Sequence, residues 1–223
     1  MSEHPVLGVD WYRGGWVGVL LGPAEQPQVL ARDDLRALIA DAGDPACVGI
    51  DMPIGLPVRE RRADALARQF VRPRGQSVFA TAPAEVLAAA TYAEANEIAA
   101  RLLDGKKISQ QSWALRHNIE RVAEVADEDP RLVEVHPEVS FRELIGRPLP
   151  FAKTTWNGQA LRRRALAGQG IEFPDELGEA GVVPVADVLD AGAAAWSARR
   201  HAQGLAKSLP AAAPRGAVQV IWY

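Results

Sequence analysis

Short apolar segments that each end in a carboxylate constrain the fold of this chain most strongly. The apolar run over residues 6–10 ends in Asp10, and a second run over residues 47–51 ends in Asp51. A carboxylate at the end of a buried strand has to be paired, protonated or bound to a cation, because an isolated buried charge is too costly. We therefore expect these strand ends to meet in a compact acidic cluster.

Four further acidic residues lie in or beside apolar segments later in the chain. Glu134 and Glu138 bracket a third apolar segment, and Asp187 and Asp190 lie one helical turn apart in an Ala-rich segment. The latter two share a helix face, where their repulsion calls for a cation beside at least one of them. By strand alternation Glu134 and His136 point to the same side of the sheet.

Clusters of carboxylate oxygens suit Mg²⁺ or Mn²⁺. The predicted metal ligands are Asp10, Asp51, Glu138 and Asp190. Asp187 and Lys153 are predicted to complete the catalytic site, Asp187 by completing or tuning the acidic cluster and Lys153 by contacting a phosphate.

Each of these residues also has a structural interpretation that the sequence leaves open. Asp10 suits a turn acceptor and Asp51 a cap before Met-Pro, and Glu138 suits the first turn of a helix, where it complements the dipole. Lys153 lies in a loop and also suits simple solvent exposure. The basic run over residues 162–164 is predicted to be a solvated helix face, although its first member, Arg162, is a second candidate for phosphate contact.

The order of predicted elements indicates one α/β domain over residues 1–223 with a helical insertion at about 53–130. Strands are predicted over residues 6–12, 16–21, 28–31, 47–50 and 131–136, and an edge strand over residues 217–223. Helices are predicted over residues 34–42, capped by Asp33, and over 60–70, 84–103, 109–125, 137–145, 159–167 and 185–203.

Charge, hydropathy and cysteine content limit the binding partners and cellular location that we expect for the protein. The net charge of −3 gives no broad attraction to nucleic acid, so such binding needs a local basic patch. No apolar stretch approaches the ~20 residues of a membrane span. The single cysteine excludes an internal disulfide, and the N-terminus lacks the order of a signal peptide. We expect a cytoplasmic protein without membrane contact.

This order of elements resembles the ribonuclease-H-like fold, a mixed five-stranded sheet flanked by helices. In that superfamily, acids at the end of the first strand, at the end of the fourth and on the last helix hold two metal ions. Here the corresponding positions are Asp10, Asp51 and Asp190. The segment over residues 187–195 also resembles the last helix of Holliday-junction resolvases. The resemblance implies two-metal hydrolysis of phosphodiesters.

A second resemblance rests on a series of short segments in a fixed order. They are residues 8–10 with Gly15 and Trp16, residues 49–57, residues 77–79, Gln110 with Trp113, residues 134–138 with Ser140 and Phe141, Lys153 and Thr154 with Gly158, and residues 187–195. Together they resemble the family called domain of unknown function 429, whose members are described as predicted ribonuclease-H-like nucleases. The resemblance extends over nearly the whole chain.

The sequence thus predicts a Mg²⁺- or Mn²⁺-dependent nuclease whose partner is DNA or RNA. A non-catalytic nucleic-acid-binding or scaffold protein of the same fold is the first alternative, because the chain is acidic. A phosphotransferase of the actin-like ATPase fold ranks lower. That fold shares the start over residues 8–10, but it needs a duplicated second domain for which this chain is too short.

Overall fold

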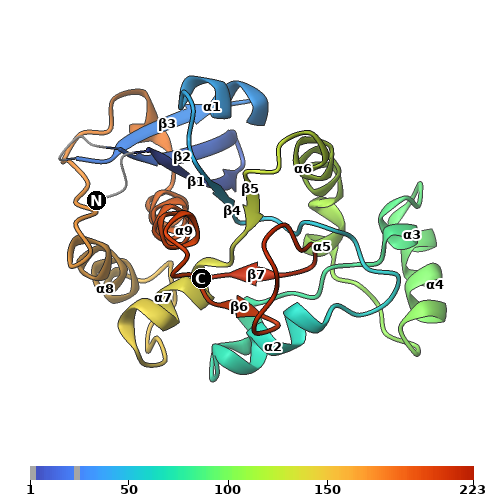
Figure 1. The fold of residues 1–223 in the computed structure, drawn as a ribbon. Helices are drawn as coiled ribbons and strands as arrows, with labels where there is room; N and C mark the ends of the chain where they lie inside the picture. Colours follow the sequence, from blue (N-terminus) through green and yellow to red (C-terminus); the bar gives the residue numbers. More distant parts are fainter. Residues whose placement is uncertain (1–3, 23–25) are drawn as a thin grey trace.

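A mixed five-stranded sheet forms the centre of the protein (Figure 1). The computed structural model describes residues 4–22 and 26–223. The strands lie in the order β3-β2-β1-β4-β5; β1 pairs antiparallel with β2 and β2 with β3, whereas β1, β4 and β5 run parallel. Their bounds are β1 Val6–Tyr12, β2 Gly15–Leu21, β3 Gln28–Arg32, β4 Val48–Ile50 and β5 Leu132–Glu134. The predicted α/β class and five-stranded mixed sheet are confirmed.

Helices cover both faces of this sheet. The long helix α9 (Val185–Ala202) packs on one face, in an apolar cluster with Val17 and Val19 of β2. On the other face, α1 (Leu35–Asp41) and α6 (Arg116–Glu128) share a separate cluster with the strands. β1 and β4 lie between two layers of helix. Because both of their faces are covered, nearly all of their residues are apolar.

Two glycines allow α9 to lie directly on the sheet. Gly8 of β1 and Gly49 of β4 are partners in the parallel ladder. A Cβ atom on Gly8 would lie 2.0 Å from the backbone nitrogen of Ala195, and one on Gly49 would lie 2.7 Å from the carbonyl oxygen of Ala194. The small residues of α9 and these two glycines therefore fix how close the helix comes to the strand ends.

The elements that the structure describes between β4 and β5 are all helical. They are α2 (Arg62–Phe70), η1 (Gly75–Ser77), α3 (Ala84–Leu87), α4 (Tyr92–Leu102), α5 (Gln110–Ala114) and α6. The continuous helix predicted over residues 84–103 is wrong, because residues 88–91 separate α3 from α4.

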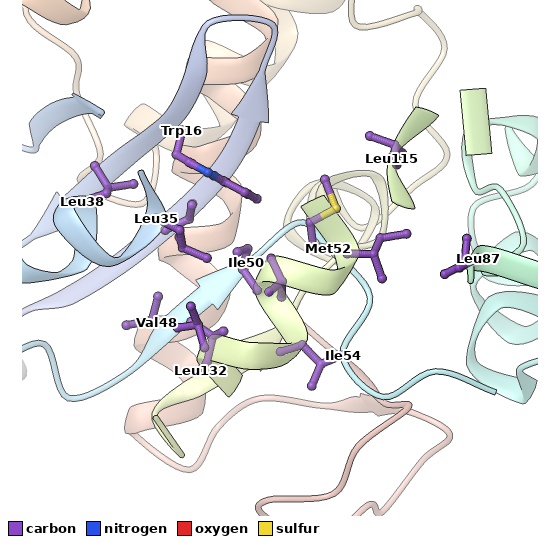
Figure 2. Packing of buried hydrophobic residues seen from close by; sticks show 14 of the residues in the cluster. Trp16, Leu35, Leu38, Val48, Ile50, Met52, Ile54, Leu87, Leu115 and Leu132 are labelled. Carbon is purple, nitrogen blue, oxygen red and sulfur yellow. The ribbon is translucent and has the colours of Figure 1, made fainter. Parts of the chain in front are cut away.

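One apolar cluster joins the sheet to this helical segment. Figure 2 shows side chains of the sheet, of the chain that leaves β4 and of the helical segment in one packed group. Its labelled members include Val48, Ile50, Met52, Ile54, Leu87 and Leu115. Burial of this shared apolar surface holds the helical segment against the strands.

The remainder of the chain follows β5. It contains α7 (Pro137–Ile145), α8 (Trp156–Ala167), η2 (Gly178–Val182), α9, β6 (Ser208–Leu209) and β7 (Ile221–Trp222). β7 pairs antiparallel with β6 in a separate two-stranded sheet, and within the described residues Trp222 forms one isolated parallel bridge to Val135, the residue that follows β5. The terminal segment is therefore not an edge strand of the main sheet.

The N-terminal cap of α1 differs from the predicted one. The cap is Asp34 and not Asp33. The Asp34 side chain accepts a hydrogen bond from the backbone nitrogen of Ala37 at 2.9 Å.

Among the described helices, none combines the length and apolar character needed to cross a membrane.

Substitution of Gly8 tests the contact between α9 and the sheet. Gly8→Ala places a methyl group inside the backbone of α9, so we expect the free energy of unfolding to fall by ~3 kcal/mol. Gly181→Ala is the matched control, since a Cβ atom there would meet no atom within 4 Å in the part of the chain that the structure describes. Denaturant unfolding of both variants provides the measurement, and equal stability of the two variants would contradict the close approach.

Candidate metal centre

Asp10, Asp51 and Asp190 meet where β1 and β4 end. The parallel ladder pairs Gly8 with Gly49 and continues through the hydrogen bond from the Asp51 nitrogen to the Val9 oxygen, 2.9 Å long. Asp10 and Asp51 are each two residues beyond the paired glycines, so strand alternation turns both side chains to the α9 face.

The third carboxylate reaches the same point from the helix. α9 lies on Gly8 and thereby carries Asp190 to the strand ends. One carboxylate oxygen from each of Asp10, Asp51 and Asp190 lies within 4.8 Å of the others. Asp10 is 5% exposed and Asp190 is 3% exposed, so two of the three carboxylates lie almost fully out of water. We call these three residues the carboxylate triad.

Burial and mutual repulsion of the three carboxylates favour the binding of a cation at this triad. Burial, and then the charges of Asp51 and Asp190, raise the pKa of Asp10 well above its usual value. Burial raises the pKa of Asp51 to about 7 and that of Asp190 to about 6. Three carboxylate oxygens this close together form the donor set that Mg²⁺ and Mn²⁺ prefer. The triad therefore fits a divalent cation.

Lys153 lies beside the triad. Its Nζ atom is 2.5 Å from Oδ2 of Asp190 and 3.8 Å from Oδ1 of Asp187. Burial alone would lower the pKa of Lys153, but the carboxylates of Asp190 and Asp10 outweigh it and raise that pKa above its usual value. The ammonium group thus supplies the positive charge that the i, i+3 pair on α9 requires.

Glu138, the fourth predicted ligand, is balanced by arginines. Its Oε1 atom accepts a hydrogen bond of 2.5 Å from Nη2 of Arg162, and its Oε2 atom lies 3.7 Å from Nε of Arg74. Arg162 is fully buried, so the predicted solvated face over residues 162–164 is wrong at this position. The reason is that its guanidinium also donates to the carbonyl oxygens of Phe151 and Gly158.

Glu134 has a buried partner of its own. Its two carboxylate oxygens lie 2.6 and 2.8 Å from Nη2 of Arg61, and Oε2 also accepts from the Ile54 nitrogen at 2.7 Å. Arg61 further donates to Thr81 at 3.1 Å. This network ties the helical segment to the end of β5. His136 lies nearby with a buried Nδ1 atom that has no hydrogen-bond partner among the described residues, and burial lowers the pKa of its imidazole.

A pocket of about 460 Å³ opens over the triad. Its walls come from the strand ends, from the loop around η1 and from α5, α7 and α9. Besides the triad, the residues that line it include Arg13, Arg74 and Lys153 as cations, Gln76 and Gln111 as amides, Trp11, Tyr12 and Phe79 as aromatics, and Glu134, His136, Glu138 and Asp187. The pocket therefore combines an acidic centre with cationic, amide and aromatic groups.

Removal of the charge at Asp51 and at Glu138 should change the free energy of unfolding in opposite directions. In protein stripped of metal at neutral pH, we expect Asp51→Asn to raise the free energy of unfolding by ~1–3 kcal/mol, because it removes a repelled charge. Glu138→Gln is expected to lower it by ~3 kcal/mol, because the charge of buried Arg162 loses its partner. Chemical unfolding with chelator present measures both. A loss of stability in both variants would show that Asp51 is a structural cap.

The raised pKa values predict how stability changes with pH. Asp51 in the folded protein keeps its proton up to about 7, whereas its ordinary pKa is 3.8, so the folded state binds more protons in between. Stability of the metal-stripped protein must then fall as pH rises through that window. The stability gain of Asp51→Asn should therefore grow from about pH 4 to pH 7. Unfolding measured across this range checks it, and a constant gain would contradict the raised pKa.

Comparison with known proteins places the chain in a family whose function is unknown. No curated protein and no solved structure matches it. The family model described as protein of unknown function (DUF429) matches residues 8–215, which include the whole triad. The chain therefore belongs to the DUF429 family.

Proposed function

We propose that the protein is a Mg²⁺- or Mn²⁺-dependent nuclease that hydrolyses phosphodiester bonds in DNA or RNA. The observation that carries this proposal is the carboxylate triad, with its ligand atoms within 4.8 Å of one another. Asp10, Asp51 and Asp190 would hold the cation. A bound divalent ion supplies an activated water and polarises a phosphoryl oxygen.

The strand order supports a ribonuclease-H-like fold. The sheet runs β3-β2-β1-β4-β5 with only the first three strands antiparallel, and the triad acids lie near the end of β1, directly after β4 and on α9. These are the places where the resemblance puts metal ligands.

The other groups of the pocket suit a nucleic-acid substrate. Arg13 and Lys153 offer positive charge for phosphate oxygens. Trp11 and Phe79 offer aromatic surfaces on which a base can stack. Asp187 is half-buried beside Lys153, and burial raises the pKa of its carboxyl. That carboxylate is suited to take a proton from an attacking water.

A non-catalytic nucleic-acid-binding or scaffold protein is the second candidate. The observation that favours the scaffold form of this candidate is the net charge of −3, with 28 acidic against 25 basic residues. A protein that grips a long stretch of nucleic acid through many phosphates normally carries more basic surface. Metal binding without cleavage of any substrate would select this candidate.

The proposal predicts metal-supported cleavage that depends on the triad. With Mn²⁺ or Mg²⁺, the protein should cleave at least one of a panel of single-stranded, duplex and branched DNA and RNA substrates, without ATP. Asp190→Asn should abolish cleavage, and Asp175→Asn, at a fully exposed side chain, should leave it unchanged. Gel analysis of both variants gives the measurement.

Two results would count against the nuclease. Cleavage that survives Asp190→Asn would come from a contaminant or from another site. A melting temperature unaffected by either ion would contradict the metal site itself, because an ion that binds only the folded state must stabilise it.

A further inference from the structure

Lys153 and a divalent ion would compete for the same carboxylate, that of Asp190. The ammonium group of Lys153 lies 2.5 Å from the Asp190 carboxylate, which is also one of the three residues able to hold a cation. A lysine carries only donors, so it neutralises a carboxylate but shares no ligand position with a metal ion. A divalent ion close to the triad would repel the ammonium group strongly, since both are positive and lie in a buried setting.

The side chain of Lys153 has room to move, whereas the backbone next to it, at Ala152 and Thr155, is held in place. The hydroxyl of Thr155 donates to the Ala152 oxygen at 2.8 Å, and the Thr155 nitrogen donates to the same oxygen at 3.1 Å. Gly158 packs against this oxygen so closely that a Cβ atom there would lie 1.8 Å from it. The Lys153 side chain itself is 39% exposed and lines the pocket. Its four-carbon stem allows the head group to leave Asp190 without movement of the loop.

The buried side chain of Arg162, unlike that of Lys153, is held in place by several partners. Arg162 donates to the Glu138 carboxylate and to two backbone carbonyl oxygens, and its side chain is 1% exposed. It is a fixed counter-ion. Lys153 instead pairs only with carboxylates, those of Asp187 and Asp190, among the contacts that the structure describes.

We propose that Lys153 is an exchangeable counter-ion of the carboxylate triad. It neutralises Asp190 and Asp187 when no divalent ion is bound, and it leaves Asp190 when one binds. Its head group then lies in the pocket, free to pair with a phosphate oxygen of the substrate. This inference rests on the proposed metal site and assigns Lys153 a positioning role that couples ion binding to substrate binding.

The first test is calorimetric titration of Mn²⁺ into metal-stripped protein. Lys153→Met should bind the ion at least ~10-fold more tightly than the wild type, because a competing charge at contact distance has gone. Lys106→Met is the matched control. Its Nζ atom also lies 2.5 Å from a carboxylate, that of Glu60, but Lys106 does not line the pocket. We expect the affinity of this control to equal that of the wild type.

The second test follows the lysine in the wild-type protein. An amine-acylating reagent is added with chelator or with saturating Mn²⁺, and modification of each lysine is quantified by mass spectrometry. An ammonium group held by two carboxylates is protected from acylation, so modification of Lys153 should rise several-fold when Mn²⁺ is added. Lys106, Lys107 and Lys207 serve as internal standards whose modification should stay constant.

The outcomes separate this inference from the proposed function. Equal or weaker Mn²⁺ binding by Lys153→Met, with clear binding by the wild type, would overturn the exchange and leave the metal site standing. Absence of binding in both proteins would overturn the metal site and the exchange together. If Lys153→Met does not fold, the labelling measurement decides alone, and unchanged modification of Lys153 at saturating Mn²⁺ would overturn the exchange.

Discussion

Crowding of negative charge at one edge of the sheet is the constraint around which this protein is organised. The triad brings three carboxylates together in a largely buried place, although like charges out of water repel strongly. The close contact of α9 with Gly8 and Gly49 enforces this arrangement. Packing of the helix on the sheet therefore stabilises a cluster that its own electrostatics oppose, which is common where a fold holds a functional site.

The neighbouring acids show how the chain limits this crowding. Glu134 is neutralised by Arg61, and Glu138 by Arg162, in two buried ion pairs. Each pair also ties together segments that are distant in the sequence. With those charges balanced, the triad and Asp187 remain, and Lys153 is the lysine that contacts Asp187 and Asp190. The distribution of partners thus separates acids that pair with buried arginines from the acids of the proposed metal site.

Much of the fold and of the candidate site could be predicted from local patterns. Asp10 and Asp51 follow short apolar runs, and Asp190 lies on an Ala-rich helix face, so strand and helix periodicity placed them correctly in β1, after β4 and in α9. The sheet then brings the strand ends together because parallel neighbours end at the same edge.

The remaining features depend on contacts between distant residues. Arg61 pairs with Glu134 across 73 positions and Arg162 with Glu138 across 24, and no spacing rule reaches so far. Arg162 looked solvated because it stands in a run of three arginines, of which it alone turns inward to Glu138. The C-terminal strand was misplaced for a similar reason: β-propensity indicates a strand but does not choose its partner, which is β6.

The most direct test of the metal centre is a crystal structure of the wild-type protein soaked in Mn²⁺, with anomalous diffraction recorded near the manganese absorption edge. We predict an anomalous peak between the carboxylates of Asp10, Asp51 and Asp190, with the Lys153 ammonium group no longer in contact with Asp190. A fully soaked crystal without a peak at the triad, or with Lys153 still paired there and manganese bound elsewhere, would contradict this account.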